Sequence, residues 1–328
     1  MPRIMRNFDR SYCTTFLRLA ALATFLTGCT LTSSLAQQPG QKTFSSPEDA
    51  SRALVAAAQS NDEKVMLDIL GPDGRQIVSS GDDTEDANNR VNFVQRYQEM
   101  HRLAVEPDGS TTLYIGAENW PTPIPLANKG SAWFFDTDAG KKEILYRRIG
   151  RNETSAISVS LELVAAQKEY WGSHDNEYAQ KLFSDEGRHN GLYWKAGDGE
   201  PQSPIGPLVA SAVADGYPKV QDGISTPYRG YYFRILTEQK KTASTEAKNY
   251  VVHGKMSRGF AFVAYPAEYR SSGVMTFIVN EDGVVYEKDL GAKTGGIAKA
   301  MKEYNPNSSW QEAEEQPNDE TVATQRTK

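Results

Sequence analysis

Between residues 46 and 104 the spacing of hydrophobic positions predicts three helices. The first opens at Ser46 with a capping serine, a proline and two acids, and the second runs from Asn61 to Gly71. The third covers residues 85–104. Its helical period places four side chains on one face, those of Val91, Val94, Tyr97 and His101.

From residue 111 the hydrophobic period shortens to two, which predicts an antiparallel sheet. Short runs of aromatic and β-branched residues are separated by Pro, Gly and Asp, and they cover residues 111–118, 121–127, 130–138 and 142–150. The prolines of the second run suit an edge strand, because proline cannot donate to an inner ladder.

After Gly150 the helical period returns, with helices expected over residues 152–171 and 176–187. A stretch rich in Gly and Pro follows to residue 230. The next strands are expected over residues 231–237, 249–256, 259–269, 273–280 and 283–291, with a last helix over 295–305. The turn from Asn280 to Gly283 predicts a hairpin, since glycine accepts positive φ there.

These patterns predict an α+β protein of two domains, each made of helices and an antiparallel sheet. We expect the boundary near Gly150, where sheet-like spacing ends and helical spacing begins. The domains would cover residues 44–150 and 151–312, and each should unfold cooperatively as a separate fragment. The acidic and polar residues 313–328 are expected to form a disordered tail.

The N-terminus has the pattern of a bacterial lipoprotein signal peptide. Residues 1–28 carry four arginines, then a short apolar run that is too short to span a bilayer. Leu26-Thr27-Gly28-Cys29 is similar to a lipobox, which implies lipidation of Cys29 and cleavage before it. The residue after Cys29 is Thr30. An aspartate at this position would resemble an inner-membrane retention signal, so threonine favours a location on the periplasmic leaflet of the outer membrane. Residues 29–43 would be a flexible tether.

Charge and cysteine content narrow the classes of function. The whole chain has a net charge of −6, and removal of the basic residues 1–28 makes the remainder more acidic. Such a body does not bind nucleic acid through phosphate contacts. Cys13 leaves with the signal peptide and Cys29 is acylated, so we expect no disulfide, cysteine–metal cluster or catalytic thiol.

Four segments carry a resemblance to a known family, namely PYRGYYFRIL, GKMSRGFAFVAYPAEY, SGVMTFIVNEDGVVYEKDLG and YNPNSSW. They resemble DUF 2950, a bacterial family of secreted proteins known only as a domain of unknown function. The resemblance covers most of the chain after the signal peptide. It implies no activity.

Element order suggests two weaker likenesses. Helices followed by a curved sheet over residues 44–150 resemble the cone fold of nuclear transport factor 2, whose relatives use the cone as a small-molecule pocket. The second domain resembles the globular part of type IV pilins, although the apolar first half-helix of a pilin is absent. Filament assembly is therefore not expected.

No catalytic or metal-binding constellation is evident, and we expect no cofactor. His174, Asp175, Glu177 and His189 are possible metal ligands, but without regular spacing a solvated loop is favoured. A binding surface would instead use exposed aromatic residues near the loops rich in Gly and Pro, since Tyr and Trp dominate interfaces. The candidates are Tyr193, Trp194, Tyr217 and Tyr228, and the alternative is that these rings only cover the sheet.

Two functions remain open. The favoured one is a non-catalytic binding module, anchored to the membrane by lipid, whose partner is an envelope protein or cell-wall component. The alternative is a small-molecule binder or hydrolytic enzyme that uses the pocket of the first domain. A buried charged cluster at the mouth of that pocket would reverse the preference.

Overall fold

A computed structural model describes residues 37–218, 226–241 and 246–313. The predicted signal peptide, Cys29, the first part of the tether and the tail from residue 314 lie outside these ranges. The described residues belong to one compact unit. They form helices and antiparallel sheets, which confirms the α+β class.

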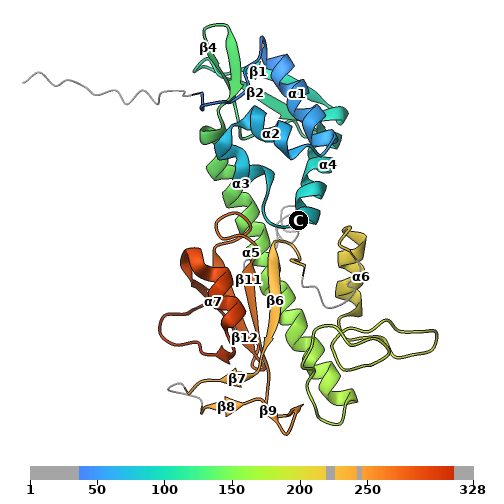
Figure 1. Cartoon of the computed structure of the whole chain (residues 1–328). Helices are drawn as coiled ribbons and strands as arrows, with labels where there is room; N and C mark the ends of the chain where they lie inside the picture. Colours follow the sequence, from blue (N-terminus) through green and yellow to red (C-terminus); the bar gives the residue numbers. More distant parts are fainter. Residues whose placement is uncertain (1–36, 219–225, 242–245, 314–328) are drawn as a thin grey trace, which may run out of the picture. The chain divides into compact units, whose positions relative to one another are not determined.

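Helices come first along the chain, as the hydrophobic spacing predicts. Ser46 caps the first helix by accepting a hydrogen bond from the Asp49 amide at 3.1 Å, and Asp62 caps the second by accepting from Val65 at 3.0 Å. The helices are α1 (Pro47–Gln59), α2 (Glu63–Leu70), the 3₁₀ turn η1 (Pro72–Gly74), α3 (Arg75–Val78) and α4 (Asp83–Glu99) (Figure 1).

The first sheet follows these helices in the order β1-β2-β4-β5, and β3 pairs with β2 beside this path. Its strands are β1 (His101–Val105), β2 (Thr111–Ile115), β3 (Trp120–Pro121), β4 (Leu126–Lys129) and β5 (Ala132–Phe135). α4 ends at Glu99, so His101 opens β1 instead of extending the helix. Val91 is 55% exposed, which corrects its predicted place on the buried face.

The segment 142–150, predicted as a strand, is helical. It belongs to α5 (Thr137–Ser173), which runs without interruption through Gly150 (Figure 1). Asp136 caps this helix at the Ala139 amide, and Glu143 pairs with Arg147 one turn later at 2.7 Å. These local helix signals outweigh the short hydrophobic alternation of the segment.

The predicted helix over 176–187 is wrong, because tertiary contacts hold this segment extended. The buried side chain of Gln167 accepts a hydrogen bond from the Ala179 amide at 2.9 Å and donates to the Ala179 carbonyl at 2.8 Å. Tyr178 also bridges to Met256 as an isolated β-pair. If the segment were helical, the amide and carbonyl of Ala179 would form hydrogen bonds within the helix instead. The buried Gln167 side chain would then lose both partners. α6 (Gly206–Ala214) is a helix within the stretch expected to be loops.

The second large sheet has the order β15-β13-β12-β11-β6, with every neighbouring pair antiparallel. Its strands are β6 (Tyr231–Leu236), β11 (Ala261–Pro266), β12 (Met275–Asn280), β13 (Val285–Asp289) and β15 (Gln311–Glu312). Every residue of β11 is buried, so both faces of the sheet are covered there. α5 packs on β12, and α7 (Thr294–Ala300) packs on β11 (Figure 1).

Short strands complete the fold. They are β7 (Glu238–Gln239), β8 (Lys248–Asn249), β9 (Val251–Val252), β10 (Lys255–Met256) and β14 (Glu303–Tyr304), and the 3₁₀ turn η2 is Gly291–Lys293. The predicted hairpin is confirmed between β12 and β13. Its Gly283 has φ +79° and donates to the Asn280 carbonyl at 3.0 Å.

Within the described ranges, the buried hydrophobic residues form two clusters. One combines α1–α4 with the first sheet and includes Ile144 of α5 among the side chains packed on it. The other combines the later part of α5, from Ala156 to Tyr170, with the second sheet. α5 therefore contributes to both clusters, and the division into domains at Gly150 stays a prediction.

Candidate functional site

The helices α1–α4, the first sheet and the start of α5 line a cavity of about 470 Å³. This volume is typical of a pocket for a small organic ligand. Most of its lining is apolar, with side chains from all of these elements: Leu54, Ala58, Met66, Leu70, Ile77, Val78, Phe93, Leu113, Ile115, Trp120, Ile124, Phe135 and Ile144. We call this space the N-terminal cavity.

Helix periodicity brings charged residues of α4 and α5 to the N-terminal cavity. Asp86, Arg90 and Phe93 recur at spacings of three or four, so they share one face of α4. The same spacing along α5 puts four more residues in the lining, namely Ile144, Arg147, Arg148 and Arg151. With Arg96, the described part of the lining holds five arginines and one carboxylate, that of Asp86.

Arg148 and Asp86 are the most deeply buried of these charges, with exposures of 5% and 3%. Arg148 donates to the carbonyls of Gln76 at 2.7 Å and Ile77 at 2.6 Å, so it fixes the backbone of α3. Burial lowers the pKa of Arg148, and the charges of Asp86 and Glu85 oppose that shift. The guanidinium stays charged at any physiological pH.

Asp86 combines a structural contact with an unpaired atom. Its Oδ2 accepts a hydrogen bond from the Ser80 amide at 2.7 Å. Its Oδ1 is buried and has no partner in the described ranges. Burial raises the pKa of this carboxyl, against the effects of the Ser80 amide and Arg148. A buried unpaired carboxylate oxygen is costly to the folded state.

Two further lining residues carry buried side-chain atoms without partners in the part of the chain that the structure describes. They are Nε of Arg90 and Oγ1 of Thr122. Within the same ranges only five such atoms are found, and the other two belong to Thr111 and Thr276, which do not line the cavity. Folded proteins pair nearly all buried polar groups, so these three atoms are exceptions, but each is covered by neighbouring protein atoms and does not face the open space of the cavity.

Arg96 and Arg147 are exposed lining residues, and an acidic neighbour partly neutralises each of them. Arg96 lies 3.6 Å from Glu118, and Arg147 lies 2.7 Å from Glu143. Such exposed pairs contribute little to stability, so these cations stay available to an incoming anion. Arg147 also lies over the ring of Trp120, 5.5 Å from its centroid.

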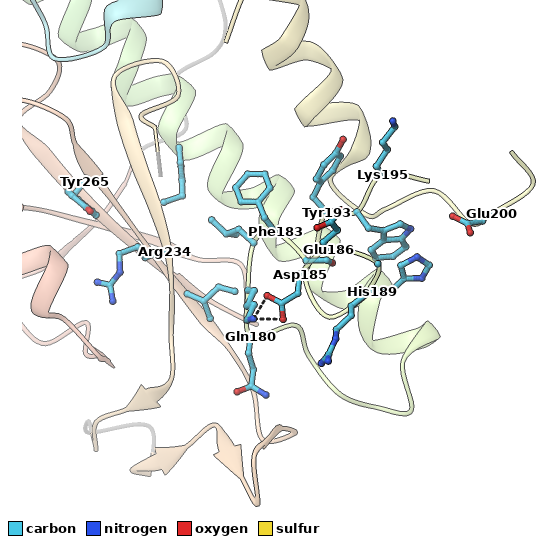
Figure 2. A pocket seen from close by; sticks show the side chains of 18 residues that line it. Gln180, Phe183, Asp185, Glu186, His189, Tyr193, Lys195, Glu200, Arg234 and Tyr265 are labelled. Carbon is cyan, nitrogen blue, oxygen red and sulfur yellow. Dashed lines mark hydrogen bonds and ion pairs between the residues drawn. The ribbon is translucent and has the colours of Figure 1, made fainter. Parts of the chain in front are cut away.

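A second and wider cavity, of about 1300 Å³, lies between β6 and the segment 180–200. Figure 2 shows that its side chains do not converge, because Arg234 and Tyr265 lie on the sheet side and His189 and Glu200 on the opposite side. Several of its charged groups already have partners within the fold. Lys181 contacts both carboxylate oxygens of Asp185, at 2.6 and 2.7 Å (Figure 2).

Arg234 belongs to this cavity but its guanidinium donates to the Ala298 carbonyl at 2.7 Å. His189 stacks on the ring of Trp194 with the ring centroids 4.4 Å apart. As far as the described residues show, the N-terminal cavity combines a mostly apolar lining with five arginines, whereas the charged groups of the wide cavity are dispersed. We take the N-terminal cavity as the candidate functional site.

The four aromatic candidates from the sequence do not form one exposed surface. Tyr193 is half-buried beside the wide cavity, and Trp194 is 7% exposed. The Trp194 indole donates to the Pro201 carbonyl at 3.0 Å, which fixes the ring inside the fold. Trp194 is thus a buried packing residue, contrary to the exposure expected for it. A binding role for Tyr193 stays a prediction.

Tyr217 and Tyr228 lie together at a different place. Their rings meet edge to face with centroids 5.1 Å apart. Tyr217 is 8% exposed, contrary to expectation, and its hydroxyl donates to Oδ2 of Asp82 at 2.8 Å. Burial raises the pKa of Tyr217, and the nearby Asp82 charge adds to that shift. Tyr228 is half-buried, and its binding role is untested.

The histidine candidates have structural contacts. His174 stacks on Tyr170, 3.7 Å between ring centroids, and its Nδ1 lies 3.1 Å from the Tyr170 carbonyl. The described residues contain no cluster of three or more His, Cys, Asp or Glu side chains able to hold a metal ion. Within those ranges, likewise, no helix combines the length and hydropathy required to cross a bilayer.

These features define an α+β protein with a cavity of ligand size whose lining is apolar and rich in arginine. The chain belongs to the family described as a protein of unknown function, DUF2950, whose model matches residues 41–313. It matches no curated protein and no solved structure.

The sequence did not identify the cavity residues, although the signal was present. Arg147, Arg148 and Arg151 form a stripe only if their segment is helical. A strand would place Arg147 and Arg148 on opposite faces. The wrong period for residues 142–150 therefore concealed the site.

Proposed function

We propose that this chain is a lipid-anchored envelope protein that binds a small amphipathic molecule in its N-terminal cavity. The observation that carries the proposal is a cavity of about 470 Å³ whose mostly apolar lining also carries five arginines among the described residues. The buried charges of Asp86 and Arg148 in its lining support use of the pocket of the first domain over an exposed aromatic surface.

Binding suits this lining better than catalysis does. The described lining residues include no histidine or cysteine, and among them only Thr122 carries a hydroxyl group. Nucleophilic catalysis requires a nucleophile held beside a general base. An apolar wall with a few polar groups at one side is instead the usual design of a ligand pocket.

Cavity filling tests this function. We expect Leu54→Trp to weaken binding of the neutral dye N-phenyl-1-naphthylamine by about tenfold, because the larger ring occupies the cavity that Leu54 lines. The measurement is dye fluorescence with the full-length Cys29→Ser chain, which should carry no lipid.

A matched control separates blocking from misfolding. Leu161 is also a partly buried leucine of a helix, but it packs on the other hydrophobic cluster. Leu161→Trp should leave dye binding unchanged, with both variants keeping the circular dichroism of the parent. Unchanged affinity in folded Leu54→Trp, or no dye binding by the parent chain, would contradict the proposed function.

The anchor is tested separately. The basic start, short apolar run and Leu26-Thr27-Gly28-Cys29 support lipidation at Cys29 and an outer-membrane location. We expect the wild-type chain to begin at a lipid-modified Cys29, and Cys29→Ser to accumulate as unprocessed precursor. Intact-mass measurement decides, and an unlipidated protein cleaved at another residue would exclude the anchor.

A further inference from the structure

The wide cavity lies against the free edge of the second large sheet. In the strand order β15-β13-β12-β11-β6, β6 is the last strand, so β11 pairs with only one of its two edges. Three consecutive residues of β6 line the wide cavity, namely Phe233, Arg234 and Ile235. An unpaired strand edge presents a row of main-chain donors and acceptors with which another strand can pair.

The pairing pattern shows which main-chain groups of β6 face away from β11. In an antiparallel pair, the amide and carbonyl groups of successive residues point alternately to the two edges of a strand. Tyr231 points away from β11, because its amide donates to the Tyr228 carbonyl at 3.1 Å and its carbonyl accepts from the Tyr228 amide at 2.8 Å. Its partner in the register with β11 is Pro266, which has no amide hydrogen. Phe233 and Ile235, two and four residues further on, therefore point to the same free edge.

This edge is closed at its ends and open in its middle. Tyr228 closes one end, and at the other end the Thr237 carbonyl accepts from the Tyr250 amide at 2.9 Å. Between them, no main-chain hydrogen bond to Phe233 or Ile235 from the free side is found among the described residues. The open stretch thus offers the amides and carbonyls of two residues to the wide cavity. Alternating donors and acceptors of this kind match the main chain of another extended segment.

The shape of the wide cavity favours a single peptide segment as the occupant. Its volume of about 1300 Å³ exceeds the usual range for a small-molecule pocket, about 300–1000 Å³. The wall opposite β6 belongs to the segment 180–195, which carries Phe183 and Tyr193 (Figure 2). A folded sheet edge, such as β6 of a second copy of the chain, would have to displace this wall. An isolated extended segment would not.

The side chains of β6 restrict the sequence of the segment. Phe233 and Ile235 lie on one face of the sheet, since side chains alternate along a strand. Both are partly buried and pack on the hydrophobic cluster of the second large sheet, as do Leu182 and Tyr193 of the opposite wall. Residues that pair directly with Phe233 and Ile235 place their side chains on that same face, where apolar cross-strand neighbours are favoured. The segment should therefore carry β-branched or aromatic side chains at alternate positions.

We propose that the free edge of β6 binds an extended peptide segment of another protein, which adds to the second large sheet as an antiparallel strand. The amide and carbonyl of Phe233 and of Ile235 pair with the main chain of that segment. Antiparallel pairing continues the pattern of every neighbouring pair in this sheet. Main-chain pairing requires no convergent side chains, which agrees with their dispersal in the wide cavity (Figure 2). This surface is separate from the N-terminal cavity and goes beyond the proposed function.

Fluorescence anisotropy of a labelled peptide tests the main-chain pairing with the full-length Cys29→Ser chain. The peptide alternates threonine and valine, with a lysine at each end for solubility. The valines are expected opposite Phe233 and Ile235, where directly paired residues exchange both hydrogen bonds. N-methylation of the valines should therefore weaken binding by more than about tenfold, whereas N-methylation of the threonines should change it by less than about twofold.

Ile235→Pro tests the same edge from the side of the protein. It removes the Ile235 amide hydrogen, which β11 does not use, and an edge strand tolerates proline at a residue whose amide faces outward. Binding of the unmodified peptide should weaken by more than about tenfold. Ile235→Ala is the matched control, because it shortens the side chain but keeps the amide. It should weaken binding by less than about threefold, with both variants keeping the circular dichroism of the parent.

Several outcomes would overturn the proposal. They are no binding of the unmodified peptide at about 1 mM, equal binding of the two methylated peptides, or parental affinity in folded Ile235→Pro. A parent chain that is a dimer by light scattering, and that Ile235→Pro converts into a monomer, would show that a second copy occupies the edge instead. The methylated peptides use only the parent chain, so they decide the result even if Ile235→Pro does not fold. Leu54→Trp should leave peptide binding unchanged, which separates this proposal from the proposed function.

Discussion

Asp82→Ala is expected to lower the free energy of unfolding by about 3–5 kcal/mol, because it leaves several buried donors without an acceptor. Asp82 is 1% exposed. Its Oδ1 caps α4 by accepting from the Glu85 amide at 3.0 Å. Its Oδ2 accepts from the Tyr217 hydroxyl and from the Gly230 amide, both at 2.8 Å.

The large effect follows from the environment of those donors. The hydroxyl of Tyr217 accepts from the Arg229 amide at 2.9 Å and donates to Asp82. Gly230 is itself buried, so water does not replace the lost carboxylate readily. Hydrogen bonds to a charged group contribute more than neutral ones, and the loss of an N-cap alone costs about 1 kcal/mol.

Asp83 offers a matched control, since it is the next residue and lies exposed in the first turn of α4. Asp83→Ala should cost less than about 1 kcal/mol, the usual contribution of an acid near a helix start. Asp82→Asn should fall between the two, because its amide retains one acceptor oxygen. Urea unfolding measures all three variants. Equal stability of Asp82→Ala and Asp83→Ala would show that the buried contacts contribute nothing.

The contacts of Asp82 show what the sequence alone could predict here. An aspartate before a helix is a recognisable N-cap, and the helix start near residue 83 follows from local pattern. Its two other partners lie 135 and 148 residues away along the chain. No local spacing encodes such pairs, so the burial of Tyr217 could not be predicted and the residue was expected to be exposed.

The difference between local pattern and long-range contacts also explains the errors in the predicted secondary structure. The hairpin at Asn280–Gly283 is determined by its own turn residues and was predicted correctly. The segment 176–187 was predicted as a helix because its sequence suits one, but the Gln167 side chain holds the Ala179 backbone extended. Contacts from outside a segment override its propensity.

The candidate site was missed for a related reason. Its residues lie on two helices, and one of these was assigned the wrong period over residues 142–150. Once α5 is helical, the spacing of Arg147, Arg148 and Arg151 places them on one face. The unpaired state of Asp86 Oδ1 is a property of the folded chain, and no sequence pattern reports it.

Substitution by alanine should change the free energy of unfolding in opposite directions at two glycines of α5. The two variants together test whether this helix is continuous. Alanine is a better helix former than glycine by about 1 kcal/mol. Gly150 has nothing within 4 Å of the position that a Cβ would occupy. Gly150→Ala should therefore raise the free energy of unfolding by about 1 kcal/mol.

At Gly140 the same change should lower that free energy by about 2–3 kcal/mol, because a Cβ would overlap backbone that has no room to move. The added carbon would lie 2.6 Å from the carbonyl carbon of Pro123 and 2.7 Å from Cγ1 of Ile124. Since Ile124 lines the N-terminal cavity, Gly140→Ala should also weaken binding of N-phenyl-1-naphthylamine, and Gly150→Ala should not. Urea unfolding measures the change in stability of the two variants, and dye titration measures the change in their affinity for the dye. If Gly150→Ala destabilises the chain, the helix is not continuous through the predicted domain boundary, and the arginine stripe on its face loses its structural basis.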